Sequence, residues 1–402
     1  MGTQFYQEKP DAASLALFGG KPAFDHTLHV GRPNIGDRER LMARINDILD
    51  RRWFTNNGPV VQAFEQAVAD LVGVRHAVAM CNATIAQEIT VRALGLQGEV
   101  IVPSFTFIAT AHALHWQDIT PVFCDVAPNS HHIDPQQVEA LITPRTTAIV
   151  GVHVWGQACN VAALTSIAHQ HNLKLIFDAA HALGGSYQRQ MIGGFGDAEF
   201  FSFHATKFIN AFEGGMVTTN NDALAEKMRH MRNFGFVGYD DVDYMGTNGK
   251  MSEVSAAMGL TSLEAIDSII DVNRRNYTAY QTHLADIPGL SLYAYDPQEH
   301  QNYQYVIVEV DETAGTDRDT LIRILTAENV LARRYFYPGC HQMEPYRTMF
   351  PAVGARLPRT EHLTRRVMSL PTGTAVTPED IEKICQICRF AMEHHDEIRV
   401  RL

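Results

Sequence analysis

The stretch TAIVGVHVWGQACNVAALTSIAHQHNLKLIFDAA (147–180) places two apolar, β-rich runs on either side of a segment with helical periodicity. The first run covers 147–154 and the second covers 174–180, while residues 161–172 repeat their apolar positions every three to four residues. This order is typical of a βαβ unit, in which a crossover helix joins two parallel strands. Residues 147–180 therefore predict a parallel sheet covered by helices.

Five further runs of the same kind lie within residues 77–219. They are AVAM (77–80), VIVPS (100–104), TPVFCDV (120–126), EFFSF (199–203) and GGMVTT (214–219). Helical periodicity fills most of the intervals between neighbouring runs, as in a chain that winds helices over both faces of one sheet. We therefore predict an α/β fold with a large, doubly wound domain around a mixed, mainly parallel sheet.

Beyond residue 220 the pattern changes to longer helices and fewer strands. A helix is expected to end at Gly235, and residues 252–287 predict long helices interrupted near Gly259. The strand candidates LSLYAY (290–295) and YQYVIVEV (303–310) precede helical patterns at 317–330 and 377–395. The expected organisation is an N-terminal segment (1–30), a large α/β domain (31–275) and a smaller α+β domain (276–402).

The composition is that of an acidic globular protein. The 402 residues are 46% hydrophobic and 19% charged, which excludes a mainly disordered chain. The net charge is 33 − 45 = −12, so we expect no nucleic-acid partner, because an acidic surface repels a phosphate backbone. The sequence shows neither a secretory signal pattern nor a long apolar run. We expect a cytoplasmic protein without membrane contacts and without disulfides.

Asp178 and Lys207 are the first candidates for chemistry. Each closely follows an apolar run, and ligands in open α/β sheets bind at the carboxyl ends of the strands. A buried acid needs a cationic partner, and a protonated pyridine nitrogen is one such cation. A desolvated lysine loses its proton readily and can form a Schiff base with an aldehyde. The pair thus fits a pyridoxal phosphate site, although an ordinary ion pair is the commoner arrangement of two such residues.

Two further signals point to the same edge of the sheet. The segment NATIAQEITVRALG (82–95) starts a helix directly after a strand, so Ala83 and Thr84 can present amides to a phosphate. A simple helix cap is the alternative. Phe107 follows another strand and can stack on a pyridine ring, or it can belong to the core.

The segment FSFHATKFINAFEGGMVTTN (201–220) resembles the pyridoxal-phosphate-dependent sugar aminotransferases of the DegT/StrS type, which have the aspartate aminotransferase fold (fold type I). Other blocks follow in the family's order. They are FGGKPAF (18–24), WFTNNGPVVQAFE (53–65), PSFTFIATAHAL (103–114), FCDVAPNSHHIDP (123–135), FDAAHALGG (177–185), GTNGKMSEVSAAMGL (246–260) and RRYFYPGCH (333–341). The resemblance covers nearly the whole chain.

The resemblance implies a role for each matching residue. Lys207 matches the lysine that binds the cofactor through a Schiff base, and Asp178 matches the acid that pairs with the pyridine nitrogen. Ser202 matches a phosphate ligand. Thr84 and the backbone of Ala83 match the phosphate cradle at the helix start. The expected cofactor is pyridoxal 5'-phosphate, with pyridoxamine 5'-phosphate as its intermediate form.

Phe107 matches the aromatic residue that stacks on the ring. Asn248 resembles the asparagine that reaches the phosphate from the neighbouring subunit, which implies a homodimer with shared active sites.

Three positions depart from the family pattern. Ala83 stands where Gly is usual, His181 where Gln is usual, and Lys250 where many members have Arg. His181 can still bind the cofactor's 3-hydroxyl or cover the ring. Lys250 is expected to face an anion or to be a solvated surface lysine.

Within the family, SFHATK, EGG and GTNGKMSE resemble the subgroup that aminates C4 of dTDP-linked 4-keto-6-deoxy sugars. The implied reaction uses L-glutamate as donor and gives dTDP-4-amino-4,6-dideoxyglucose. Alternatives are a C3 ketone, a UDP-linked sugar, or a non-catalytic relative that acts as a sensor. The presence of Lys207 argues against the dehydratase branch, which carries His there. Five residues are unranked candidates for the sugar pocket: Phe54, Asn56, Trp155, His204 and Tyr337.

No metal site is expected. Cys385 and Cys388 fall in an apolar helical pattern without a second pair at zinc-finger spacing. The pair His131-His132 is expected in a surface loop, where it would not bind a metal.

Overall fold

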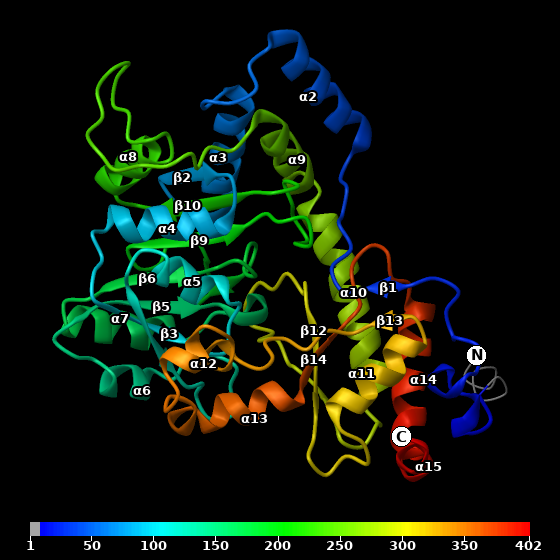
Figure 1. Ribbon diagram of the computed structural model, residues 1–402. Helices are drawn as coiled ribbons and strands as arrows, with labels where there is room; N and C mark the ends of the chain where they lie inside the picture. The colour runs from blue at the N-terminus through cyan, green and yellow to red at the C-terminus, as the bar shows by residue number, and fades with distance from the viewer. Residues whose placement is uncertain (1–8) are drawn as a thin grey trace.

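The computed structural model describes residues 9–402, so residues 1–8 of the expected N-terminal segment lie outside the described residues. Its centre is a seven-stranded sheet in the order β2-β10-β9-β6-β5-β3-β4 (Figure 1). Only β10 runs antiparallel to its neighbours within this sheet. All seven predicted runs form its strands: β2 (His76–Met80), β3 (Glu99–Pro103), β4 (Thr120–Cys124), β5 (Thr146–Val152), β6 (Lys174–Asp178), β9 (Ala198–Ser202) and β10 (Gly215–Thr219). The predicted mixed, mainly parallel α/β sheet is confirmed.

The βαβ unit of residues 147–180 consists of β5, α7 (Val161–Gln170) and β6. Val150 pairs with Ile176 in the parallel ladder between the two strands. The side chain of Asn160 caps α7 by accepting the N–H of Ala163 at 3.1 Å, which fixes where the helix begins. Helical periodicity and capping thus agree with the observed crossover.

Helices cover both faces of the sheet, and successive residues of one strand show this directly. Val100 and Val102 of β3 share a core with α4 (Ala83–Ala93), α5 (Ala109–His115) and α8 (Asp222–Met231). Ile101 between them points to the opposite core, which contains α6 (Pro135–Ala140) and α7. A strand buried on both faces has no polar alternation, which explains the continuous apolar runs. On that second side, a further core joins α2 (Arg38–Arg51), α3 (Pro59–Val72) and α9 (Glu253–Leu263).

The long helical region differs in detail from the prediction. α8 ends at Met231 rather than at Gly235, and the break between α9 and α10 (Ile266–Leu284) lies at residues 264–265 rather than near Gly259. Gly259 is inside α9, where a Cβ would lie 2.6 Å from the ring of Phe64 on α3. This glycine allows two helices to pack closely, and it does not interrupt either of them.

The C-terminal part of the chain forms a three-stranded antiparallel sheet with helices packed on it. α10 passes from the large sheet to this region, and the expected boundary at 275/276 falls inside it (Figure 1). The elements are β11 (Leu290–Leu292), β12 (Val306–Val310), α11 (Arg318–Ala327), β13 (Val330–Leu331), α12 (Tyr346–Met349), α13 (Pro358–Arg366), β14 (Val367–Leu370), α14 (Pro378–Glu393) and α15 (His395–Arg401). None of the helices in residues 9–402 is long and apolar enough to cross a membrane.

The described N-terminal residues belong to the core of the smaller domain. β1 (Leu28–His29) pairs in parallel with β13. Leu15 and Phe24 are buried in one cluster with residues of β12, α11 and α14. The remaining short elements are the 3-10 helices Ala12–Ser14, Ala16–Phe18, Val154–Gly156, Cys340–Gln342 and Gly354–Arg356, and the strands β7 (Ser186–Tyr187) and β8 (Gln190–Met191).

Asp125, one residue beyond β4, joins the large sheet to α13. It is completely buried, and one carboxylate oxygen accepts the N–H and the hydroxyl of Thr360, both at 2.7 Å. The other oxygen accepts the N–H of Arg359 at 3.1 Å. These amides belong to the first turn of α13, where N–H groups have no partner within the helix and negative charge is favoured. Asp125 therefore anchors α13 against the large domain.

Replacing Asp125 with Ala should lower the free energy of unfolding by about 3–5 kcal/mol, because buried amides lose their acceptor. Denaturant unfolding followed by circular dichroism measures this change. Asp311→Ala is the matched control, since its half-exposed carboxylate bonds mainly to Thr313. We expect that change to have a much smaller effect, because interactions of exposed carboxylates are screened by solvent. Equal effects of the two substitutions would contradict the anchoring role of Asp125.

Candidate active site

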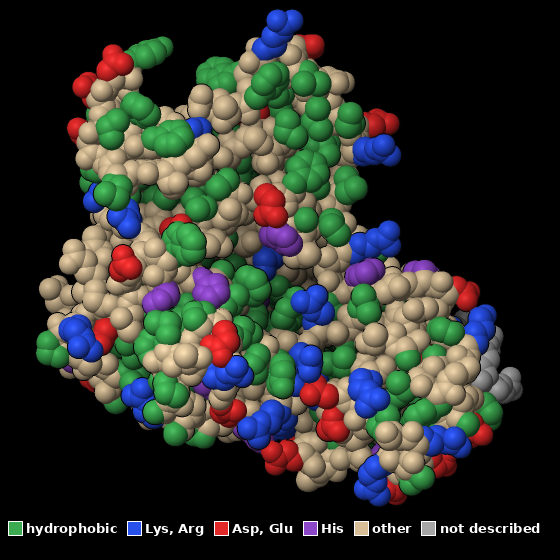
Figure 2. Space-filling view, in the orientation of Figure 1, with side chains coloured by type: hydrophobic (Ala, Val, Ile, Leu, Met, Phe, Trp, Pro, Cys, Tyr) green, Lys and Arg blue, Asp and Glu red, His purple; other side chains and the backbone are tan. Residues whose placement is uncertain are grey.

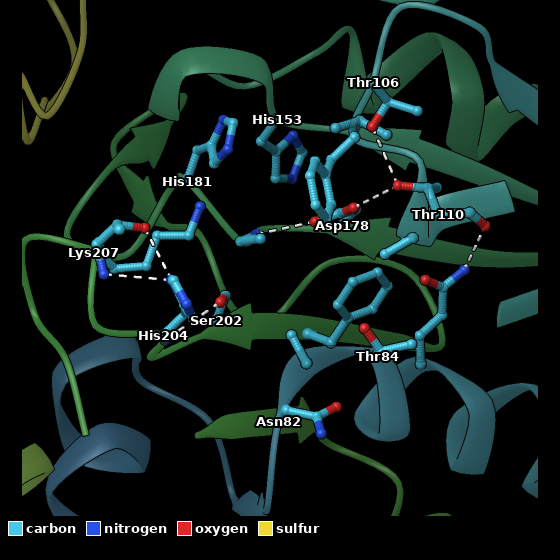
Figure 3. Close-up of a pocket in the computed structure, with 18 of the residues that line it drawn as sticks. Asn82, Thr84, Thr106, Thr110, His153, Asp178, His181, Ser202, His204 and Lys207 are labelled. Carbon is cyan, nitrogen blue, oxygen red and sulfur yellow. Dashed lines mark hydrogen bonds between the residues drawn. The ribbon is translucent and has the colours of Figure 1, made fainter. Parts of the chain in front are cut away.

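A cavity of about 410 Å³ opens at the carboxyl ends of the parallel strands. Figure 2 shows it as a hollow between the two domains, with basic (Lys or Arg) and histidine side chains in and around it. Seven of the eight predicted cofactor residues line this cavity: Ala83, Thr84, Phe107, Asp178, His181, Ser202 and Lys207. They come from separate strand ends of the large domain, so the fold brings together residues far apart in sequence (Figure 3).

Asp178 ends β6 and is only 7% exposed. Its carboxylate accepts the Thr110 hydroxyl at 2.9 Å and the N–H of Ala180 at 3.0 Å. No salt bridge reaches it from any residue of the described chain 9–402. Burial raises the pKa of Asp178, while the bond from Ala180, the bond from Thr110 and the charge of Lys207 oppose the rise. The site therefore offers a buried carboxylate with room for a cation.

Lys207 lies in the loop between β9 and β10, and its Nζ is directed into the cavity. Burial lowers its pKa to about 8, and the carboxylate of Asp178 limits the decrease. The Nζ donates to the phenol oxygen of Tyr305 at 3.3 Å. An amine with this pKa is partly uncharged near neutral pH, so it can act as a nucleophile and as a base.

The start of α4 forms a cradle at the cavity wall. Asn82 caps the helix by accepting the N–H of Ile85 at 2.9 Å, and the amides of Ala83 and Thr84 belong to the first turn, which lacks acceptors within the helix. Ala83 has helical backbone angles, so its replacement of the family's Gly leaves the amide in place. Gly215 on β10 passes close by, and a Cβ there would lie 2.5 Å from the Ala83 nitrogen. Glycine at this position allows β10 to pass close to the first peptide of α4.

Trp155 fixes the orientation of His181. The backbone N–H of Trp155 donates to Nδ1 of His181 at 3.3 Å, so the proton of the neutral ring is on Nε2. Burial and the nearby Lys207 hold the pKa of His181 well below its usual value. His181 is therefore a neutral hydrogen-bond donor, as a glutamine amide would be at this position.

Several lining residues were not predicted from the sequence: Thr110, His153, Tyr305, Arg333, Tyr335 and Phe336. The hydroxyls of Thr106 and Thr110 are 3.1 Å apart, and the Thr110 hydroxyl donates a hydrogen bond to the carboxylate of Asp178. Thr110 is in the first turn of α5, four residues after Thr106, so its closeness to the end of β3 is the signal that could have found it. Tyr305 and the residues from 333 to 336 come from the smaller domain, and no local pattern links them to this cavity.

Other predicted residues lie elsewhere. Asn248 does not reach the cavity of its own chain; it is exposed and forms a bridge with Asn233. Lys250 donates to Asn233 at 3.0 Å and lines a separate surface hollow with Asn56. Among the unranked sugar-pocket candidates only His204 lines the main cavity, whereas Phe54, Trp155 and Tyr337 do not.

The expectation that His131 and His132 lie on the surface is wrong. Both are buried, with exposed fractions of 4% and 8%. His131 accepts the indole N–H of Trp155 at 2.8 Å and donates to Glu309 at 3.0 Å, while His132 bonds to the carbonyl of Gln157. Their polar contacts inside the protein explain the burial. No group of residues with metal-binding geometry occurs within residues 9–402.

Residues 36–389 match the model of the DegT/DnrJ/EryC1/StrS aminotransferase family. The chain belongs to this family. It is 36% identical over 369 residues to the dTDP-4-amino-4,6-dideoxy-D-glucose transaminase of Shigella dysenteriae, with 92% of this chain and 99% of the relative covered. The predicted family and the predicted enzyme class, a pyridoxal-phosphate-dependent sugar aminotransferase, are confirmed.

Two solved structures show the same fold over nearly their full lengths. The aminotransferase superposes on DesI, whose structure was determined in the presence of its TDP-sugar product, with a TM-score of 0.93 and 51% identity. The overlap covers 97% of this chain and 99% of DesI. PseC of Helicobacter pylori, an aminotransferase of pseudoaminic acid biosynthesis, gives a TM-score of 0.85 and 27% identity over 91% and 99% of the two chains. These likenesses support the fold-type I assignment.

Pyridoxal phosphate is the cofactor of this aminotransferase family, and the cavity fits it. The open amides at the start of α4 suit a phosphate, because they are unpaired donors at the positive end of the helix dipole. The buried carboxylate of Asp178 suits a protonated pyridine nitrogen. Lys207 supplies an amine of lowered pKa within the same cavity. Each chemical part of the cofactor thus has a complementary group.

Acylation of Lys207 in the cofactor-free aminotransferase should be half-maximal near pH 8, because its pKa is lowered to about 8. Mass spectrometry of the labelled peptide measures this, with surface lysines, which titrate at ~10.4, as internal reference. Asp178→Asn removes the carboxylate that favours the ammonium form, so it should move the midpoint to lower pH. A Lys207 midpoint equal to that of the surface lysines would contradict the assignment.

Proposed function

We propose that this aminotransferase transfers the amino group of L-glutamate to the C4 ketone of a dTDP-linked 4-keto-6-deoxyhexose, giving dTDP-4-amino-4,6-dideoxyglucose. The observation that carries the proposal is the likeness to DesI at 51% identity over 97% of this chain. Transaminases named for this amino sugar in Shigella dysenteriae and Escherichia coli support it, at 36% and 33% identity. A GDP-perosamine synthase of Caulobacter vibrioides is 35% identical, so a GDP-linked 4-keto sugar is the second candidate substrate.

The roles proposed for the residues follow from their positions. Pyridoxal phosphate, when bound, supplies an electron-accepting ring that carries the amino group between the two substrates. Asp178 holds the proton on the ring nitrogen, which keeps the ring electron-poor. Lys207 takes a proton from the α-carbon of the donor through Nζ, and it returns a proton to C4 of the sugar. Because one base serves both substrates in turn, we expect ping-pong kinetics.

The remaining cofactor contacts are proposed from their places in the cavity. The amides of Ala83 and Thr84, with the hydroxyls of Thr84 and Ser202, bind the phosphate. Phe107 is half exposed at the cavity wall, and we propose that it stacks on the ring. We propose that the Nε2–H group of His181 would donate a hydrogen bond to the 3-hydroxyl of the cofactor ring.

We propose further that the enzyme is a homodimer and that Asn248 completes the phosphate site of the partner chain. Asn248 is exposed on the loop between α8 and α9 and is not part of its own cavity. Large apolar side chains around it are also exposed, as expected of a surface that another chain covers. They are Phe234, Phe236, Val237, Tyr239, Val242 and Met245.

A cytoplasmic location is proposed as well. All six cysteines are free, and five of them are completely or almost completely buried in apolar clusters of the two domains: Cys124, Cys159, Cys340, Cys385 and Cys388. Unpaired cysteines are the rule in a reducing compartment. Fractionation of the producing cells tests this location.

The substrate assignment predicts that dTDP-4-keto-6-deoxyglucose plus glutamate gives a dTDP-amino sugar, detected by mass spectrometry. The GDP-linked 4-keto sugar should react at least tenfold more slowly in kcat/KM. Lys207→Ala should lower kcat by more than 10³-fold, since the base of both half-reactions is lost. Faster turnover of the GDP-linked sugar, or of a 3-keto isomer, would overturn the assignment.

Shared active sites predict complementation between two inactive variants. Lys207→Ala removes the base, and Asn248→Asp places a carboxylate against the partner's phosphate. In a 1:1 mixture about half of the dimers are mixed and each has one intact site, so about a quarter of the wild-type activity should return. Native mass spectrometry verifies subunit exchange. Mixed dimers without recovered activity would contradict the role of Asn248.

A further inference from the structure

Tyr305 comes from the smaller domain but has its phenol in the active-site cavity. It directly precedes β12, and its side chain is 6% exposed. Its ring is held by Trp155 at 5.5 Å, His181 at 4.5 Å and Tyr335 at 6.2 Å between ring centroids. Its carbonyl accepts the Tyr295 hydroxyl at 2.9 Å. Packing and this hydrogen bond fix the position of the phenol oxygen.

The hydrogen bonding of Tyr305 differs from that of the other buried tyrosines. The hydroxyls of Tyr277, Tyr280 and Tyr295 donate to backbone carbonyls, and the hydroxyl of Tyr346 bonds to His112. The Tyr305 oxygen instead accepts from Lys207, and its own proton has no acceptor among residues 9–402. Buried hydroxyls rarely lack an acceptor, so this proton is available to a group bound in the cavity.

The distance to Lys207 limits what that group can be. Lys207 acts on the reacting carbon of the substrate, so this carbon must come within ~3–3.5 Å of Nζ. The Tyr305 oxygen is 3.3 Å from the same Nζ. With the reacting carbon on the side of Nζ that faces Tyr305, an oxygen bonded to that carbon is within hydrogen-bond reach of the free Tyr305 proton. The carbonyl oxygen of the acceptor substrate is such an oxygen.

We propose that Tyr305 is a catalytic residue with two contacts: its oxygen holds the amine of Lys207, and its hydroxyl donates a hydrogen bond to the carbonyl oxygen of the substrate. This proposal rests on the transaminase function and extends it to a residue of the smaller domain. It applies to any keto substrate that reacts at Lys207, whether a sugar or a 2-oxo acid. Burial keeps Tyr305 uncharged, because it raises its pKa well above the usual value.

The first test measures Lys207 without any turnover. Tyr305→Phe keeps the ring but removes the oxygen that accepts from the ammonium form. The midpoint of Lys207 acylation in the full-length, cofactor-free chain should therefore move below pH 8. The substitution leaves the other titratable or charged groups of the cavity in place: His153, Asp178, His181, His204, Glu213, Arg333 and Tyr335. Tyr277→Phe is the matched control, since it removes a buried phenol oxygen bonded to the Tyr293 carbonyl, and it should leave the midpoint unchanged.

The second test separates the carbonyl step from the donor step in single turnovers of the cofactor-loaded enzyme. The visible band is lost when the amino donor reacts, and it returns when a keto compound takes the amino group. In Tyr305→Phe the return of the band should slow by about 100-fold, as for the loss of one donor to a developing oxyanion. The loss of the band should slow by less than tenfold.

The choice of keto compound makes the result independent of the sugar assignment. The return of the band is measured with the dTDP-linked keto sugar and, separately, with the 2-oxo acid that the donor forms. A sugar that fails to react with the wild-type enzyme overturns the proposed substrate, while the 2-oxo acid still tests Tyr305. Equal slowing of both steps, or an unchanged Lys207 midpoint, would show that Tyr305 is only structural and overturn the proposal.

Discussion

The buried carboxylate of Asp178 is the constraint on which the rest of the site depends. It ends a central strand that is packed on both faces, and it is only 7% exposed at the wall of the cavity. A carboxylate in such a place is costly unless hydrogen bonds and a cation compensate it. Thr110 and the Ala180 amide supply the bonds, and the cavity leaves the cation to a bound group. Burial also lowers the pKa of Lys207, so the same environment disfavours the charged form of both side chains.

The sheet could be predicted from sequence because its strands are mostly apolar on both faces, and polar residues follow several of its parallel strands at the cavity edge. Asp178 and Lys207 were found by this rule, whereas Ser202 was predicted by resemblance. The prediction for Gly259 was wrong because a glycine in a helical pattern resembles a helix break. The structure shows instead that the close contact with the ring of Phe64 leaves no room for a Cβ at this position. His131 was misread because its partners, Trp155 and Glu309, are distant in sequence.

The least predictable residues are those that the smaller domain contributes. Tyr305 is 98 residues from Lys207 in sequence, and nothing in its own segment except a buried strand marks it. Its place in the site depends on how the two domains pack, through contacts such as Asp125 with Thr360. Local patterns carry information about strands and caps, but they carry none about packing between domains. Asn248 is predictable only by resemblance for the same reason, since its expected contact lies in another chain.

Trp155 contacts both a histidine of the active-site cavity and a histidine that bonds to the smaller domain. Its backbone N–H sets the tautomer of His181 in the cavity, and its indole N–H sets that of His131, which holds Glu309 of the smaller domain. It does so with a left-handed backbone, at φ 62°, that a residue of its size rarely adopts. One residue, through its backbone and its side chain, thus contacts both the histidine of the cavity and the histidine that bonds to the smaller domain, so a substitution of Trp155 would disturb both contacts.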